Sequence, residues 1–365
     1  MAGIYIHIPF CKQACTYCDF HFSTSQQLRK PLIEALNKEI LLRKHEVNEP
    51  IKSIYFGGGS PSILDKGEFE SIAKTLETSF DLSELEEFTL ESNPDDHSLE
   101  KLKLWEENGV NRLSIGIQSF IDRDLELMNR AHSSSEALAC VQNARNAGFK
   151  KLTIDLIFGI PGQSMNEWQD NVEKALALNT EHLSAYALTI EPKTALAHQV
   201  AKGLVIEKND EEVEAEYRFL HEAMDKAGFE HYEISNYAIS GSRAVHNASY
   251  WSGEPYLGIG PAAHSFDGKK TRRWNVSNNA LYIKAIRENQ HFSSDEVLTK
   301  RERTNEQIMT GLRTIEGIPK TLLSFSEIRL PNHLIDAISQ TKERVSIKPE
   351  NWMMADSIIQ EFFKE

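Results

Sequence analysis

Apolar, strand-like runs alternate with longer segments of helical period through the first half of the chain. The predicted strands cover residues 4–8, 53–56, 88–91, 112–116, 152–158 and 182–187. The predicted helices between them cover residues 28–43, 66–79, 99–108, 134–147 and 165–178. Several of these segments end at Gly or Asn, as helix C termini commonly do. Six strand–helix units in succession imply a parallel sheet.

The number of units narrows the fold class. Six units are too few for the closed eight-stranded barrel and suit an open one. We therefore expect an α/β fold, a partial (β/α)6 barrel followed by a smaller, mainly helical C-terminal domain. The second half predicts an acidic helix over residues 210–227, a strand over 231–235 and a loop that contains His246. From residue 299 onward it predicts two or more helices joined by a turn at 317–319.

Composition sets the outer bounds on function. Of the 365 residues 40% are hydrophobic and 26% are charged, as in soluble globular proteins. No apolar run approaches the roughly 18 residues of a membrane span, and no basic segment precedes an apolar core at the start. We expect a cytoplasmic protein with reduced thiols. The formal charge of −14 argues against a nucleic-acid partner, because phosphate binding needs an excess of Lys and Arg.

Three of the four cysteines lie within eight residues, as Cys11-x3-Cys15-x2-Cys18, directly after the first predicted strand. Zinc commonly uses two separated Cys-x2-Cys halves, and the sequence offers no second half. Soft thiolates also select iron–sulfur clusters, and a [4Fe–4S] cube on three cysteines keeps one iron without a protein ligand. A cluster is therefore favoured over zinc. Cys140 lies on the apolar stripe of a predicted helix and is interpreted as a buried core residue.

Other unusual residues follow the ends of the predicted strands. In parallel α/β folds these ends meet at one rim, where function is usually placed. The glycine-rich run from Gly57 to Pro61 follows the second strand, and its glycines would let backbone N–H groups approach a ligand. Polar side chains suited to an amino-acid moiety or a ribose follow on the later units: Glu91, Gln118, Arg130 and Asp155. Any one of them alone would be interpreted as a surface or capping residue.

The cysteine loop and the glycine-rich loop together resemble the radical S-adenosylmethionine (SAM) superfamily. The string Tyr5-Ile6-His7-Ile8-Pro9-Phe10-Cys11 is more specific. With this string the sequence resembles, over nearly the whole chain, the group of oxygen-independent coproporphyrinogen III oxidases and HemW-type haem chaperones. The resemblance implies a [4Fe–4S] cluster on Cys11, Cys15 and Cys18, with SAM on its open iron. It implies that these residues contact SAM: Tyr5, Gly58, Gly59, Ser60, Glu91, Gln118, Arg130 and Asp155.

Two features separate the oxidases from the chaperones within this group. The oxidases have a further cysteine two residues beyond the third, where this chain has Phe20. The run His246-Asn247-x-x-Tyr250-Trp251 resembles a motif linked with haem binding in HemW, and imidazole is the usual axial ligand of haem iron. We therefore predict a haem site at His246, with His264 as a competing ligand. A lone histidine beside aromatic residues is otherwise more often a packed core residue.

The resemblance also implies partners and a domain arrangement. We expect a haem chaperone that delivers haem to an acceptor protein, with a coproporphyrinogen III oxidase as the alternative and an inactive scaffold as a third class. The expected domains are a radical SAM barrel over residues 1–235, a connecting region over 236–295 and a HemN-like C-terminal domain over 296–365. Homodimer formation and peripheral contact with a membrane are both compatible with this sequence.

Overall fold

The protein is built around one large curved sheet of twelve strands, in the order β12-β11-β10-β9-β1-β2-β3-β4-β5-β6-β8-β7. The structure, a computed structural model, describes residues 2–323 and 332–363. The six predicted strands are all present and pair in sequence order as parallel neighbours. Their bounds are β1 (Ala2–Ile8), β2 (Ile51–Gly58), β3 (Glu87–Ser92), β4 (Arg112–Gln118), β5 (Lys151–Phe158) and β6 (His182–Ala187).

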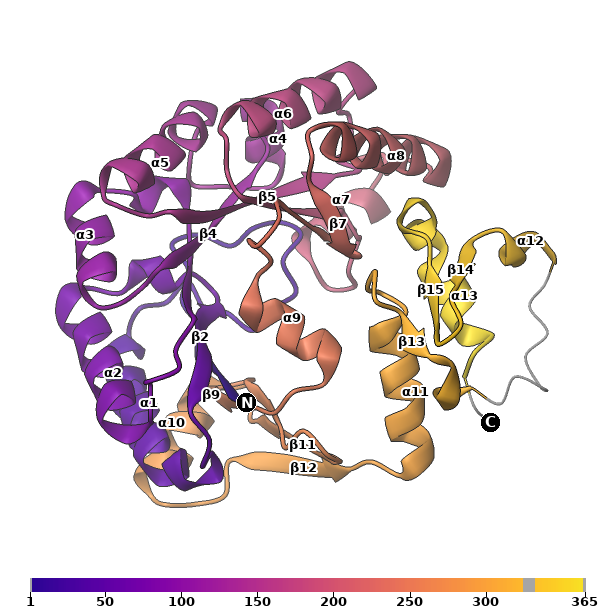
Figure 1. The fold of residues 1–365 in the computed structure, drawn as a ribbon. Coiled ribbons are helices and arrows are strands. Elements are labelled where there is room, and N and C mark those ends of the chain that lie inside the picture. Colours follow the sequence, from indigo (N-terminus) through magenta and orange to yellow (C-terminus); the bar gives the residue numbers. More distant parts are fainter. Residues whose placement is uncertain (1, 324–331, 364–365) are drawn as a thin grey trace.

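The five predicted helices cover the outer side of this sheet (Figure 1). They are α1 (Arg29–Arg43), α2 (Lys66–Ser79), α3 (Leu99–Glu107), α5 (Ser134–Asn146) and α6 (Met165–Ala177). Capping boxes fix the starts of three of them, for example Asp65 with Glu68 at α2. In a capping box each side chain bonds the other residue's free backbone N–H, which stabilises the first turn. The predicted partial barrel is confirmed.

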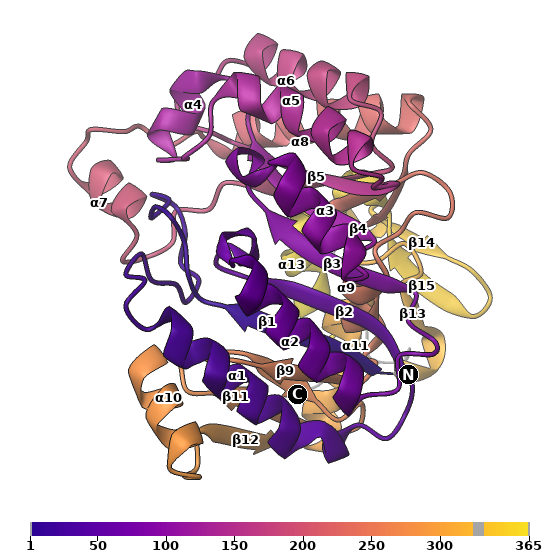
Figure 2. The ribbon, with the colours of Figure 1, turned by 90° about the vertical axis from the view of Figure 1, so that its left-hand side faces the viewer.

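Two short helices were not predicted from the sequence. These are α4 (Asp122–Leu127) and α7 (Ala195–Ala201), which are too short to show a full apolar period. Both lie at the rim where the loop after β1 runs, on the left of Figure 2. The N–H of Leu196 donates to the carbonyl of Thr16 at 2.8 Å, so α7 is bonded directly to the cysteine loop. The acidic helix is present as α8 (Asp210–Lys226).

The predicted single strand over residues 231–235 is a hairpin of β7 (Glu230–Glu233) and β8 (Asn236–Ala238), and β8 extends the sheet antiparallel to β6. The opposite edge of the barrel is extended by β9 (Tyr256–Ile259), which is parallel to β1, and by the antiparallel strands β10 (His264–Phe266), β11 (Thr271–Asn275) and β12 (Ser293–Val297). The helix α10 (Asn279–Arg287) connects β11 to β12. Residues 236–295, which were expected to form a connecting region, therefore contribute strands to the main sheet.

The segment around His246 was predicted as a loop, and that prediction is wrong. It forms the helix α9 (Val245–Ser252), which lies inside the curve of the sheet (Figure 1). The carboxylate of Glu87, at the start of β3, accepts hydrogen bonds from the N–H groups of Val245 at 2.8 Å and His246 at 3.0 Å. A distant side chain therefore satisfies two of the free donors at the N terminus of this helix.

The last part of the chain lies on the open side of the barrel, between α8 and β12 (Figure 1). It contains the helices α11 (Lys300–Gly311), α12 (Asn332–Ile335) and α13 (Ala355–Gln360). The expected turn at residues 317–319 begins a three-stranded sheet instead, formed by β13 (Ile318–Pro319), β14 (Ile338–Gln340) and β15 (Arg344–Ile347). The phenol of Tyr217 on α8 donates to the carbonyl of Pro349 at 2.6 Å, which ties this part to the barrel. The boundaries of the three domains stay a prediction.

A search of the described residues finds no helix that is both long enough and apolar enough to cross a membrane.

Candidate functional site

The loop after β1 carries the three clustered cysteines across the rim of the barrel. Its backbone is fixed by hydrogen bonds from Cys11 to Ser23 and from Thr16 to Met128, both at 3.1 Å. The three clustered cysteines are partly exposed, whereas Cys140 is buried within α5 as predicted. The loop therefore presents three cysteines at the rim of the sheet while the fourth is a core residue.

The cysteine loop suits a cluster better than a single metal ion. Among the described residues, no three Cys, His, Asp or Glu side chains converge on one point as a mononuclear site requires. A cube does not need such convergence, because each thiolate binds a different iron at a separate corner. Burial raises the pKa of Cys11, and it raises the pKa of Cys18 to about 11. The guanidinium of Arg130, 3.4 Å from Cys15 Sγ, supplies a positive charge that suits thiolates.

The glycine-rich loop does not present free backbone N–H groups, contrary to the expectation from the sequence. Gly58 donates to Glu91 Oε2 at 3.2 Å, Gly59 to the carbonyl of Ile8 at 2.9 Å and Ser60 to the carbonyl of Phe10 at 2.8 Å. A Cβ on Gly59 would lie 2.7 Å from the carbonyl oxygen of Ile8. Glycine is therefore required because this loop packs directly against the backbone that leads into the cysteine loop.

Two carboxylates face the interior, Glu91 near the end of β3 and Asp155 within β5. Glu91 accepts a hydrogen bond from the phenol of Tyr55 at 2.8 Å, and Asp155 accepts one from Ser114 at 3.2 Å. Burial raises the pKa of Glu91 to about 7 and that of Asp155 to about 6. A cationic ligand would favour the ionised form of both groups. The pair therefore suits an amine or a sulfonium, both of which SAM carries.

Asn93 connects several of the predicted residues, and it was not assigned to the SAM site from the sequence. Its Nδ2 donates to Ser60 Oγ at 3.0 Å, and its Oδ1 accepts from Arg130 Nη2 at 2.7 Å. Arg130 also donates to the carbonyl of Gly116 at 2.7 Å. Its buried Nε has no hydrogen-bond partner in the described part of the chain. The position of Asn93 at a strand end was the one available signal for its role.

Gln118 has an unusual backbone conformation at the end of β4. Its φ is 67°, in the left-handed region that few non-glycine residues adopt, and the register between β4 and β5 shifts at this point. The amide has no hydrogen bond to any residue of ranges 2–323 and 332–363. A buried residue with a strained backbone and an unpaired amide fits a ligand-binding role.

Tyr5 belongs to a group of stacked aromatic rings inside the barrel. Its ring stacks on Tyr55 at 6.1 Å, and Tyr55 stacks on His246 at 5.1 Å. His246 is only 1% exposed, and burial lowers its pKa to about 3. Its Nδ1 lies 2.9 Å from Ser53 Oγ and its Nε2 lies 2.9 Å from the phenol of Tyr250. Both ring nitrogens of His246 are therefore engaged within the protein.

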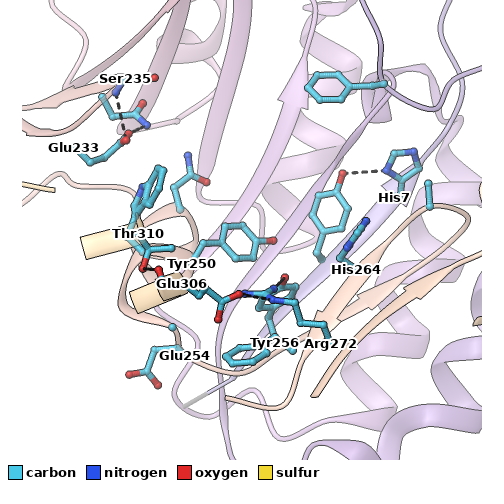
Figure 3. Close-up of a pocket in the computed structure, with 18 of the residues that line it drawn as sticks. His7, Glu233, Ser235, Tyr250, Glu254, Tyr256, His264, Arg272, Glu306 and Thr310 are labelled. Atoms are coloured by element: carbon cyan, nitrogen blue, oxygen red, sulfur yellow. Dashed lines mark hydrogen bonds and ion pairs between the residues drawn. The ribbon is translucent and has the colours of Figure 1, made fainter. Parts of the chain in front are cut away.

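A cavity of about 760 Å³ lies between the cysteine loop, α9, the hairpin of β10 and β11, and α11 (Figure 3). Phe20, which is 70% exposed, lines it from the cysteine loop, and Tyr250 and Trp251 line it from α9. His264 lines it from β10. The structure therefore brings the cysteine loop, the region from α9 to β11 and the helix α11, which are far apart in sequence, around one space. Its aromatic lining suits a flat apolar ligand.

This chain is similar to known proteins in sequence and in fold. The sequence pattern of the radical SAM superfamily matches residues 5–175. A Bacillus subtilis protein named heme chaperone HemW is 39% identical, with 88% of this chain and 85% of the relative covered. The HemW of Lactococcus lactis is 35% identical, covering 86% of this chain and 82% of the relative.

Among solved structures, coproporphyrinogen III oxidase (HemN) from Escherichia coli superposes with a TM-score of 0.85. The superposition covers 99% of this chain and 89% of the oxidase at 20% identity, so it establishes the shared fold. The HemW relatives carry the closer sequence relationship, over most of both chains. The chain therefore belongs to the HemW family of the radical SAM superfamily.

Proposed function

We propose that this protein is a haem chaperone that holds a [4Fe–4S] cluster and SAM and delivers haem to an acceptor protein. The observation that carries the proposal is the cavity of about 760 Å³, which is lined by Phe20 of the cysteine loop and by Tyr250 and Trp251 of α9. Relatives that are up to 39% identical bear the name heme chaperone. A flat tetrapyrrole matches the aromatic walls of this cavity.

In this proposal Cys11, Cys15 and Cys18 would hold the cluster, and the cluster together with SAM would supply one-electron chemistry. The protein residues hold SAM in place. Tyr5, Gln118 and the carboxylates of Glu91 and Asp155 offer polar contacts, while Gly58, Gly59 and Ser60 shape the loop against the cysteine loop. Arg130 joins this set through its bond to Asn93.

We include His246 in the haem site together with the rest of its motif. It lies behind Tyr250, and the 2.9 Å contact between His246 Nε2 and the phenol holds that ring at the cavity wall. Asn247 and Trp251, on the same helix, line the cavity directly.

The proposal also covers location and assembly. Reduced thiols are needed for the cluster, which supports a cytoplasmic location. Haem-linked dimer formation and peripheral membrane contact are further parts of the proposal.

The rival function is that of a coproporphyrinogen III oxidase, which would use SAM for the oxidative decarboxylation of propionate side chains. Phe20 at the position of the oxidases' additional cysteine favours the chaperone. The deciding experiment combines a haem titration and an oxidase assay on one anaerobically reconstituted preparation. We expect stoichiometric haem uptake with a Soret band, transfer to an apo-acceptor, and no protoporphyrinogen from coproporphyrinogen. Product formation with consumption of SAM would overturn the proposal.

A further inference from the structure

We propose that the iron of bound haem is ligated by His264 and that its propionates meet Arg272 and Arg303. This inference rests on the proposed function, because it names the residues that would hold the haem. It differs from the prediction that His246 is the iron ligand. It concerns the cavity shown in Figure 3, where His264, Arg272 and Glu306 lie on its walls.

His246 is poorly placed to ligate iron. Coordination needs a ring nitrogen with an open lone pair, and both nitrogens of His246 have partners at 2.9 Å. Its side chain is buried behind Tyr250 and does not line the cavity. Ligation would require His246 to lose a hydrogen bond and to pass the Tyr250 ring.

His264 meets these requirements without rearrangement. It lies on β10, is exposed and lines the cavity. Its imidazole makes no hydrogen bond or ion pair with any residue in the described part of the chain, and its ring stacks on Trp274 at 6.2 Å. Burial, followed by the nearby charge of Arg272, lowers its pKa, which favours the neutral form that metals bind.

The other histidines that line the cavity are less available. Nδ1 of His7 lies 3.1 Å from the phenol of Tyr5, and its Nε2 lies 2.9 Å from the carbonyl of His21. Nε2 of His21, the nitrogen farther from its backbone, lies 2.8 Å from Asn279 Oδ1. His21 keeps only Nδ1 for a metal and is the competing candidate.

The strand register places the ligand histidine and one arginine on the same face. His264 pairs with Trp274 and Phe266 pairs with Arg272 in the antiparallel hairpin of β10 and β11. Alternate residues of a strand share a face, so these four side chains project from one side of the hairpin. Iron ligation and carboxylate recognition would therefore depend on one rigid element.

The charges on this wall suit a ligand with carboxylate groups. The guanidinium groups of Arg272 and Arg303 lie over the ring of Phe266 at 4.6 and 4.7 Å, and both pair with the carboxylate of Glu306. Two cations on one anion leave a net positive charge. Asp19, Glu233 and Glu254 also line the cavity, so this cluster is a local anion site within a mixed lining. Guanidinium groups can bind carboxylates through two parallel hydrogen bonds.

The test compares haem with iron-free protoporphyrin IX on the full reconstituted chain. We expect His264→Ala to weaken haem binding at least tenfold and to shift the Soret band, while protoporphyrin IX binding changes less than twofold. Added imidazole should restore the Soret position in that variant. The control is His45→Ala, because His45 is exposed and lies outside the cavity. Arg303→Gln should weaken both porphyrins but leave the haem dimethyl ester unaffected.

The outcomes separate this inference from the proposed function. If wild-type protein takes up no haem, the chaperone proposal itself fails. If wild-type protein binds haem and His264→Ala keeps its affinity and Soret position, His264 is not the ligand. Loss of the Soret band only in His246→Ala or His21→Ala would assign the iron to that residue. Equal loss of haem and protoporphyrin IX in His264→Ala would show a role in cavity shape instead of ligation.

Discussion

The carboxylate of Glu87 accepts a hydrogen bond from the backbone N–H of His246 at 3.0 Å, although the two residues are 159 positions apart. A second bond from Val245 completes the cap at 2.8 Å. The helix that carries the His-Asn-x-x-Tyr-Trp motif is therefore capped by a side chain of the third strand. Its position inside the barrel depends on the barrel being formed.

The first prediction concerns this cap. Glu87→Ala should destabilise the protein by more than the roughly 1–2 kcal/mol of a lost helix cap, because it also leaves the buried guanidinium of Arg112, 3.8 Å away, without this carboxylate. It should also increase hydrogen exchange of the amides in α9, as measured by mass spectrometry of the peptides that cover residues 245–252. The matched control is Glu86→Ala, because the neighbouring Glu86 pairs with Lys52 in a more exposed ion pair. Unchanged exchange in α9 would show that packing alone holds the helix.

The second prediction concerns Gly58 and its contact with His7. A Cβ on Gly58 would lie 2.4 Å from His7 Nδ1, and its φ is 106°. Gly148 has a φ of 107° and nothing within 4 Å of a built Cβ. Gly148→Ala should cost about 1–2 kcal/mol through backbone strain, and Gly58→Ala should cost more because the clash adds to it. Urea unfolding of both variants measures the difference; equal losses would mean that His7 moves aside freely.

The third prediction concerns the pH dependence caused by Glu91. Burial raises its pKa to about 7 in the folded protein, so the unfolded chain loses this proton first and the free energy of unfolding falls as pH rises from about 4.5 to 7. Gln cannot ionise. Glu91→Gln should therefore raise the Tm of the cluster-free protein by roughly 2 °C at pH 8 and leave it nearly unchanged at pH 4.5. The same variant should bind SAM more weakly. A lower Tm for Glu91→Gln than for the wild-type protein at pH 8 would contradict a raised pKa of Glu91.

The fourth prediction concerns Asn93, which joins Ser60 to Arg130. Asn93→Ala removes both hydrogen bonds, and we expect SAM affinity to fall about tenfold, the equivalent of about 1.4 kcal/mol. Isothermal titration of the reconstituted protein measures this change. Asn37→Ala is the control, since Asn37 bonds Ser71 at 2.8 Å on the exposed helices α1 and α2. Equal SAM affinity in the two variants would remove Asn93 from the site.

The parallel strands and their helices could be predicted because their sequence signal is local. Buried parallel strands are continuous apolar runs, and the helices between them carry capping residues such as Asp65 and Ser133. The cysteine loop was equally clear, because three cysteines in eight residues have few alternatives. The predicted strands also carry Glu91, Gln118 and Asp155, which lie near the end of β3, at the end of β4 and within β5.

The remaining features depend on contacts between distant segments. The helix α9 has no clear apolar period and is capped by Glu87 from another strand. The three C-terminal strands are two to four residues long, too short for an alternating pattern. The bonds that engage both nitrogens of His246 come from Ser53 and Tyr250, one of them on a different element. No local pattern reports such a pairing.

The place of the first strand in the sheet has a consequence for synthesis. β1 pairs on one side with β2 and on the other with β9, whose last residue is Ile259. During translation one edge of β1 stays unpaired until about 250 further residues have left the ribosome, and unpaired strand edges are prone to aggregation. The strand that leads into the cysteine loop therefore completes its pairing only after β9 has been made.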